Sequence, residues 1–252
     1  MIRLDGATVL LQWATGGLAF LWVTTRRREV GLGYGWLLRT IYATFAVASI
    51  VVGVIFDPVA VREVFGGLMV AATVTALVVS IVRRRAGIAN FPAWLDAVAP
   101  CLGLVALIAA GIDAGDPAAL SLARVVVGAA FLGAVSDAML LGHWYLVQPG
   151  LSREPLHQMV RSIGYVWPVE LAVMLWPRGM VSALHGTVDD GYNGLLSWFW
   201  VACAITTIAL VIVTRAALRE QQYAAVMAAT GLLYLAILTG FGMDLVARAI
   251  LA

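Results

Sequence analysis

Residues 36–56 read WLLRTIYATFAVASIVVGVIF, an apolar run that contains a single charged side chain, Arg39. A hydrocarbon core about 30 Å thick is crossed by about 20 helical residues. Inside lipid, the backbone amide and carbonyl groups need partners within their own segment, which an α-helix provides. The run does not alternate apolar and polar residues, as a strand of a membrane barrel would. It therefore predicts a transmembrane α-helix.

The rest of the chain has the same character. Of its 252 residues, 62% are hydrophobic and 12% are charged, and its mean hydropathy is +0.95. These values are typical of an integral membrane protein, and no polar stretch is long enough to form a soluble domain. We expect an all-α protein with eight transmembrane helices, at residues 6–25, 36–56, 65–82, 95–112, 119–147, 160–177, 192–214 and 223–246.

Missing residue types exclude several functions. The sequence has no lysine, so a lysine Schiff base and a P-loop nucleotide-binding motif are both excluded. Cys101 and Cys203 form no C-x-x-C motif, and we expect no metal site. The net charge of +2 is too small to indicate a nucleic-acid partner.

The first apolar run has no small-residue cleavage pattern, so we expect it to remain as a span.

Arginine placement predicts the orientation of these spans. Arginines gather in alternate joins between spans, at Arg26 to Arg28, Arg83 to Arg85, Arg153 with Arg161, and Arg215 with Arg219. Positively charged loops remain on the cytoplasmic side of a membrane. The opposite loops are acidic or nearly neutral and contain Asp57, Asp113, Asp116, Asp189 and Asp190. We therefore expect both termini to face outward, from a bacterial cytoplasmic membrane.

The chain resembles itself at an offset of 131 residues. Gly33-Tyr34-Gly35-Trp36 matches Gly164-Tyr165-Val166-Trp167, and residues 33–112 and 164–243 share 16 identities in 80 positions. Apolar low complexity alone would produce part of this similarity, but the constant register favours a duplication. The sequence thus predicts two four-helix membrane units, at residues 1–117 and 118–252. An even number of spans per unit gives both units the same orientation.

Two ionisable residues occupy the same position of this repeat. Arg39 and Glu170 each follow the first glycine of a G-Y-x-W segment by six residues, which predicts similar depths in the cytoplasmic half of the membrane. Charges at such depths are costly and need a partner or a function. One interpretation is a salt bridge between the two units. In the other, Glu170 carries a proton or contacts a cofactor, and Arg39 neutralises it or receives an anionic group.

The fifth predicted span carries further polar residues. Ala129, Gly133 and Asp137 follow one another at i, i+4 spacing, which directs Asp137 into a helix contact. His143 and Tyr145 lie near the cytoplasmic end of the span, where they are either part of an interfacial aromatic belt or ligands of a cofactor. In the sixth span, Pro177 predicts a kink, after which the helix would continue to His185.

These residues suggest two cofactors without specifying either. A lipophilic quinone needs a few hydrogen-bond partners near the membrane surface, and His143, Tyr145, Asp137 and Glu170 are candidates for that role. A haem b needs two facing axial ligands, for which His143 and His157 are the candidate pair.

Three functions remain open from the sequence. The first is a redox or cofactor-handling subunit that holds a quinone or haem b and works with other membrane subunits. The second is a small proton-coupled transporter, in which Asp137, Glu170 and Arg39 form the path and a water-accessible cavity opens to one side. The third is a structural or assembly subunit of a membrane complex.

Overall fold

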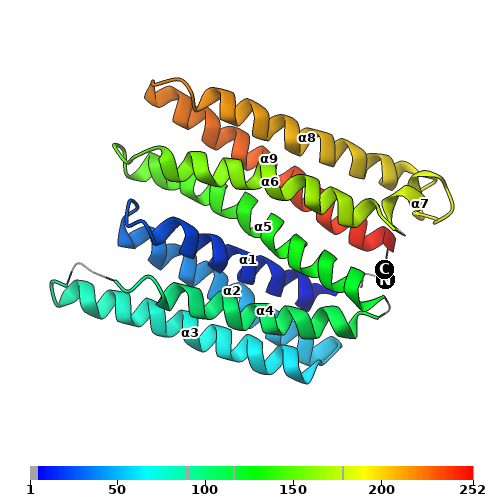
Figure 1. Cartoon of the computed structure of the whole chain (residues 1–252), viewed down its shortest axis with the longest axis horizontal. Coiled ribbons are helices and arrows are strands. Elements are labelled where there is room, and N and C mark those ends of the chain that lie inside the picture. Colours follow the sequence, from blue (N-terminus) through cyan, green and yellow to red (C-terminus); the bar gives the residue numbers. More distant parts are fainter. Residues whose placement is uncertain (1–4, 89–90, 116, 178, 252) are drawn as a thin grey trace.

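The computed structural model describes residues 5–88, 91–115, 117–177 and 179–251, and within these ranges the chain forms nine helices and no strand (Figure 1). The helices are α1 (Gly6–Thr25), α2 (Leu32–Phe56), α3 (Ala60–Arg85), α4 (Leu95–Asp113), α5 (Ala118–Val147), α6 (Glu154–Leu175), α7 (Met180–Leu184), α8 (Leu195–Ala217) and α9 (Tyr223–Leu251). The all-helical architecture predicted from the sequence is confirmed for the described residues.

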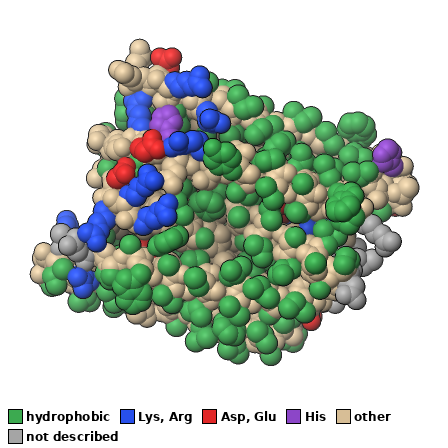
Figure 2. All heavy atoms as spheres, in the orientation of Figure 1, with side chains coloured by type: hydrophobic (Ala, Val, Ile, Leu, Met, Phe, Trp, Pro, Cys, Tyr) green, Lys and Arg blue, Asp and Glu red, His purple; other side chains and the backbone are tan. Residues whose placement is uncertain are grey.

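Seven of these helices, α1 to α5, α8 and α9, are long and apolar enough to cross a membrane. Their outward surfaces carry large apolar side chains, including Ile55, Phe56 and Leu238, each more than 60% exposed. Apolar side chains cover most of the face seen in Figure 2. An apolar surface of this extent suits lipid rather than water, and the chain is therefore a helical membrane protein.

The long helices pack in two groups that meet along α1 and α5. In the first half (α1–α4), α1 and α3 each contact both α2 and α4. In the second half (α5–α9), α5 and α8 each contact both α6 and α9. The two halves join where α5 packs against α1 and α4, so α1 and α5 lie in the middle of the molecule (Figure 1).

Glycines bring α1 and α5 into backbone contact. A Cβ atom added at Gly16 would lie 1.7 Å from the carbonyl oxygen of Ala129, and one added at Gly133 would lie 2.2 Å from the carbonyl carbon of Gly16. No side chain can occupy either position without moving the helices apart. The predicted small-residue stripe at Ala129 and Gly133 is therefore a helix contact, and it joins the two halves.

All charged loop clusters predicted to be cytoplasmic lie at one end of the molecule. The α1–α2, α3–α4, α5–α6 and α8–α9 connections meet there (Figure 1), and arginine side chains gather at the same end in Figure 2. We call this the arginine-rich end. At the opposite end, the terminal end, α1 begins and α9 finishes.

The sixth helix differs most from its prediction. It begins at Glu154 rather than residue 160 and ends at Leu175. It is not among the seven clearly apolar helices, because Glu154, Arg161 and Glu170 lower its apolar content. The predicted continuation to His185 was also wrong, since a separate short helix, α7, follows Pro177. Proline has no N–H with which to continue the helical hydrogen bonds, whereas Pro168 is accommodated inside α6.

Candidate functional site

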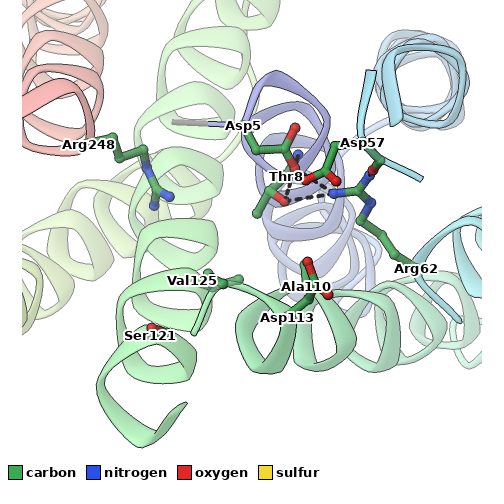
Figure 3. A pocket seen from close by; sticks show the side chains of 10 residues that line it. Asp5, Thr8, Asp57, Arg62, Ala110, Asp113, Ser121, Val125 and Arg248 are labelled. Carbon is green, nitrogen blue, oxygen red and sulfur yellow. Dashed lines mark hydrogen bonds and ion pairs between the residues drawn. The ribbon is translucent and has the colours of Figure 1, made fainter. Parts of the chain in front are cut away.

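A small polar cavity lies at the terminal end, where the two halves meet. Its volume is about 10 Å³, room for about one water molecule. Its lining comes from both halves and is Asp5, Thr8, Asp57, Arg62, Ala110, Asp113, Ala114, Ser121, Val125 and Arg248. Figure 3 shows Arg62 and Arg248 on opposite sides, with Asp5 and Thr8 between them. Cationic and anionic groups thus surround a water-sized space.

On the first-half side of the cavity, Arg62 bonds to several neighbouring groups. Its Nη1 donates to Asp5 Oδ2 at 2.5 Å, and its Nη2 donates to Glu63 Oε1 at 2.8 Å and to the carbonyl oxygen of Asp57 at 2.7 Å. Asp5 also caps α1 by accepting the backbone N–H groups of Ala7 and Thr8. These bonds satisfy donors that a helix start leaves unpaired. The cluster therefore joins α3 to the start of α1.

On the second-half side of the cavity, Arg248 forms a fully buried ion pair with Asp244, which lies one turn earlier on α9. Arg248 Nε donates to Asp244 Oδ2 at 2.7 Å, and Nη2 donates to Oδ1 at 3.0 Å. Gly128 on α5 makes room for this pair, since a Cβ there would lie 2.8 Å from Arg248 Nη2. Arg248 Nη1 is buried and has no hydrogen-bond partner among the described residues.

Glu170, on α6, is fully buried and interacts with both members of this ion pair. Its carboxyl interacts electrostatically with Asp244, Arg248 and Arg124, and Arg124 in turn donates from Nε to the carbonyl oxygen of Val173 at 2.9 Å. The Glu170 and Asp244 carboxyl groups also make a side-chain hydrogen-bond interaction, although no partner of ordinary geometry is present for either Glu170 oxygen within the described ranges. A carboxyl buried at this depth beside a second carboxyl is costly, so Glu170 is a candidate functional group.

The position of Glu170 corrects the predicted depth. It precedes the end of α6 at Leu175 by five residues, roughly 8 Å along the helix axis. Glu170 therefore lies near the terminal end rather than in the arginine-rich half. The prediction was wrong because α6 starts six residues earlier than expected, and its first turns carry charged residues outside the apolar run.

Arg39 lies near the arginine-rich end and has a different partner. Its Nε and Nη2 donate to the two carboxylate oxygens of Asp96 on α4, both at 2.8 Å. Thr25 on α1 donates to the same carboxylate at 3.0 Å, and the Arg39 guanidinium lies 4.6 Å from the centre of the Phe91 ring. The predicted salt bridge between Arg39 and Glu170 is therefore replaced by one within the first half.

Asp137 is buried on α5 and faces α2. The Tyr42 hydroxyl donates to its Oδ1, while Oδ2 is buried without a partner among the described residues. The neighbouring Ser136 hydroxyl accepts from Trp13 Nε1 at 2.7 Å. Asp137 therefore points into the junction between the halves, as its place on the small-residue stripe predicts.

His143 and Tyr145 have separate environments. The exposed His143 ring lies 3.1 Å, Nδ1 to hydroxyl oxygen, from Tyr234 on α9. The Tyr145 hydroxyl donates to the carbonyl oxygen of Ser152, which ties down the α5–α6 connection. The four candidate residues His143, Tyr145, Asp137 and Glu170 are thus distributed over different contacts and do not surround one common pocket.

The histidines proposed as haem ligands also lie in different environments. His157 lines a surface pocket of about 250 Å³ with Glu154, Arg161, Arg215 and Arg219. His143 faces Tyr234 instead, and His185 follows α7. This arrangement does not fit a haem held between two histidines. The residues that the structure describes also contain no group of three metal-ligating side chains.

Sequence reasoning missed Arg62, Asp96, Asp244 and Arg248. A local signal existed for one pair, because Asp244 and Arg248 have the i, i+4 spacing of a helical ion pair. The predicted last span ended at residue 246, between the two, which hid the pairing. Asp96 lies 57 residues from Arg39, and Asp5 lies 57 residues from Arg62, so only the fold brings each of these pairs together. Comparison with known protein families, characterised proteins and solved structures finds no match to this chain.

Proposed function

We propose that this protein is a proton-coupled membrane transporter in which Glu170 carries the proton. The observation that carries the proposal is the full burial of the Glu170 carboxyl against a second carboxyl, that of Asp244, whose ion-pair partner Arg248 lines the cavity at the terminal end. Two carboxyl groups that face each other can pass a proton from one to the other, because the protonated group donates to the ionised one.

Two residues, Arg248 and Asp244, connect the cavity to Glu170. Arg248 lines the cavity, its guanidinium is bonded to Asp244, and Asp244 interacts with Glu170. A water molecule in the cavity would contact Arg248, whose Nη1 lacks a partner among the described residues. The Arg248 guanidinium stays protonated and cannot relay a proton, so the proton would pass from this water to the Asp244 carboxylate and from Asp244 to Glu170.

Asp137 supplies a second candidate carboxyl further along the molecule. It precedes the end of α5 by ten residues, which places it about 15 Å from the arginine-rich end. Its Oδ1 accepts from Tyr42, and its Oδ2, which has no partner among the described residues, is free to take up a proton. Two such carboxyls at different depths are the arrangement that a proton path across the membrane needs.

The finer architecture is part of the same proposal. We infer that α6, with its 22 residues, is an eighth span, and that the halves arose by duplication as two four-helix units of the same orientation. With the arginine-rich end in the cytoplasm of a bacterial cell, the cavity faces outward. Glu170 would then receive protons from the side on which protons are usually more abundant.

Proton flux into proteoliposomes tests this function. Purified protein is reconstituted with pyranine inside, and a potassium diffusion potential with valinomycin makes the interior negative. We expect faster internal acidification than in protein-free liposomes, and we expect Glu170→Gln to remove the difference. Glu154→Gln is the matched control, because Glu154 lies on the same helix but is half exposed. Flux equal to that of protein-free liposomes, or full flux in E170Q, would overturn the proposal.

A second candidate function, quinone binding, is favoured by the pair of His143 and Tyr234. The two rings form an edge-on contact with 6.3 Å between centroids, on the outer surface where α5 and α9 meet. His143 is four residues from the end of α5, near the depth at which an amphipathic headgroup lies. The pair offers two hydrogen-bonding groups to a membrane-soluble quinone, although neither residue lines any of the pockets described above.

Organic extraction of the purified protein tests this second function. We expect stoichiometric quinone in the extract of the unchanged protein and less in His143→Phe, while Glu170→Gln retains it. An extract without quinone, after purification in mild detergent and after addition of excess ubiquinone, would exclude the second function. It would leave proton transport unaffected.

A further inference from the structure

A larger pocket opens at the arginine-rich end of the first half. Its volume is about 200 Å³, and it lies among the end of α1, the start of α2, the end of α3 and the segment before α4. The lining consists of Thr25, Arg28, Val30, Gly31, Leu32, Gly35, Arg39, Arg84, Phe91 and Ala93. This pocket is separate from the cavity at the terminal end and from Glu170.

The lining is strongly cationic. Three arginines, Arg28, Arg39 and Arg84, take part in it, and none of the described lining residues is acidic. Asp96, bonded to Arg39, neutralises one of these charges. Arginine clusters of this kind favour anions with several oxygen atoms, because the guanidinium group donates in a fork that fits them.

Arg39 is held in place for such an anion. The residue is 1% exposed, and Asp96 and Phe91 fix its guanidinium through two hydrogen bonds and a cation–π contact. Its remaining nitrogen, Nη1, is buried and has no hydrogen-bond partner within the described ranges. Ordering this donor in advance lowers the entropic cost of binding.

The start of α2 adds further donors. Gly31 is its N-cap residue and makes no side-chain cap hydrogen bond, so the first N–H groups of the helix have no capping side chain. Gly31, Leu32 and Gly35 all line the pocket. A helix start attracts anions through its N–H groups and its dipole. Gly35 also leaves space, because a Cβ there would lie 2.8 Å from Arg39 Nη1.

We propose that this pocket binds a phosphate group, with Arg39, Arg84 and the start of α2 as its contacts. Val30, Leu32, Phe91 and Ala93 give the pocket an apolar side that would accept the carbon chain of a phosphate ester. Phosphate from the cytoplasm and the phosphate headgroup of a lipid share this chemistry. The proposal does not depend on proton transport.

Binding to the purified protein in detergent tests the proposal with two probes. Inorganic phosphate is titrated by calorimetry, and dioleoyl phosphatidate in mixed micelles is followed by native mass spectrometry. The test variant is Arg84→Gln, because Arg84 is exposed at the pocket rim and its loss should not unfold the protein. Arg85→Gln is the matched control, since the adjacent Arg85 does not line the pocket.

We expect at least one probe to bind the unchanged protein and R84Q to weaken it about tenfold, the effect of losing one charge-assisted contact. R85Q should bind as the unchanged protein does. Binding of both probes, or of phosphate alone, identifies a soluble anion as a ligand, and binding of phosphatidate alone identifies a lipid headgroup. Binding of neither probe, or equal weakening in R84Q and R85Q, would overturn the proposal.

Discussion

The buried charges at the two ends of the molecule differ in what they leave unpaired. Near the arginine-rich end, both oxygens of Asp96 are occupied by Arg39 and Thr25, and the atom left without a partner among the described residues is the donor Arg39 Nη1. Near the terminal end, Asp244 is paired with Arg248, whose Nη1 also lacks a partner among the described residues, and the additional group there is a second carboxyl, Glu170, which faces Asp244. A spare donor suits an anion, and a spare carboxyl suits a proton.

This difference also separates structural charges from functional ones. A buried ion pair with two hydrogen bonds holds helices in one arrangement and resists change, since removing either partner leaves an isolated charge. A buried carboxyl that faces another carboxyl does not stabilise the fold as an ion pair does, and it can change its protonation state. We therefore expect substitutions at Asp96 to affect folding most, and substitutions at Glu170 to affect proton movement most.

The largest expected effect on stability is that of Asp96→Ala. The change leaves the Arg39 guanidinium buried without its carboxylate, which costs about 3–5 kcal/mol. We expect a large fall in the apparent Tm in detergent, measured by the fluorescence of a thiol-reactive or environment-sensitive dye. The double variant Arg39→Met with Asp96→Ala removes both charges and should recover part of the loss. Equal Tm values for D96A and the unchanged protein would show that the pair is not a structural anchor.

Gly16→Ala tests the junction between the halves. The new Cβ would overlap the carbonyl oxygen of Ala129 at 1.7 Å, so α1 and α5 must separate, and overpacking of this kind costs about 1–3 kcal/mol. We expect a lower apparent Tm and more aggregation in size-exclusion chromatography. Gly67→Ala is the control, because no atom lies within 4 Å of a Cβ added there. Identical behaviour of the two variants would contradict the backbone contact.

Tyr42→Phe should have an effect no larger than that of Gly16→Ala. It removes the hydroxyl that donates to Asp137 Oδ1 and leaves that carboxyl with no side-chain donor among the described residues, at a cost of about 1–3 kcal/mol. We expect a moderate fall in Tm that Asp137→Leu, added to the same variant, partly reverses. If Asp137→Leu lowers the Tm of Y42F by as much as it lowers the Tm of the unchanged protein, the two groups do not interact.

The smallest expected effect is at Asp190, in the loop before α8. Its carboxylate accepts the backbone N–H of Ser197 at 2.9 Å, as well as those of Gly194 and Tyr192. These hydrogen bonds, that of Ser197 first, lower the pKa of Asp190 from 3.8 to about 2. Because the pKa is lower in the folded state, the stabilisation is complete above about pH 4 and is lost as the pH falls towards 2.

Asp190→Asn should therefore be slightly less stable than the unchanged protein at neutral pH. The difference in apparent Tm should shrink as the pH is lowered from 5 towards 2. Asp189→Asn serves as the control, since Asp189 accepts a single backbone N–H, that of Gly191. A difference that stays constant with pH would contradict the lowered pKa.

The sequence predicts the helices better than their side-chain partners. Apolar runs mark the membrane spans because lipid requires them, and the i, i+4 stripe of Ala129, Gly133 and Asp137 correctly predicts a helix contact. Helix ends are less predictable, because charged residues such as Glu154 and Arg161 extend a helix beyond its apolar run. Because α6 begins at Glu154, Glu170 lies five residues before the end of the helix, near the opposite end of the molecule from Arg39. The Arg39–Asp96 and Arg62–Asp5 pairs depend on packing between distant segments, which one sequence does not reveal.

The most direct test of the account is whether Glu170 exchanges a proton in the folded, membrane-embedded protein. Infrared difference spectra of the protein in lipid films are recorded between acidic and alkaline buffer, in H₂O and in D₂O. We predict a carboxyl C=O band that shifts in D₂O, is absent in E170Q and remains in E154Q. A set of carboxyl bands that is the same in E170Q and in the unchanged protein would contradict the central role of Glu170.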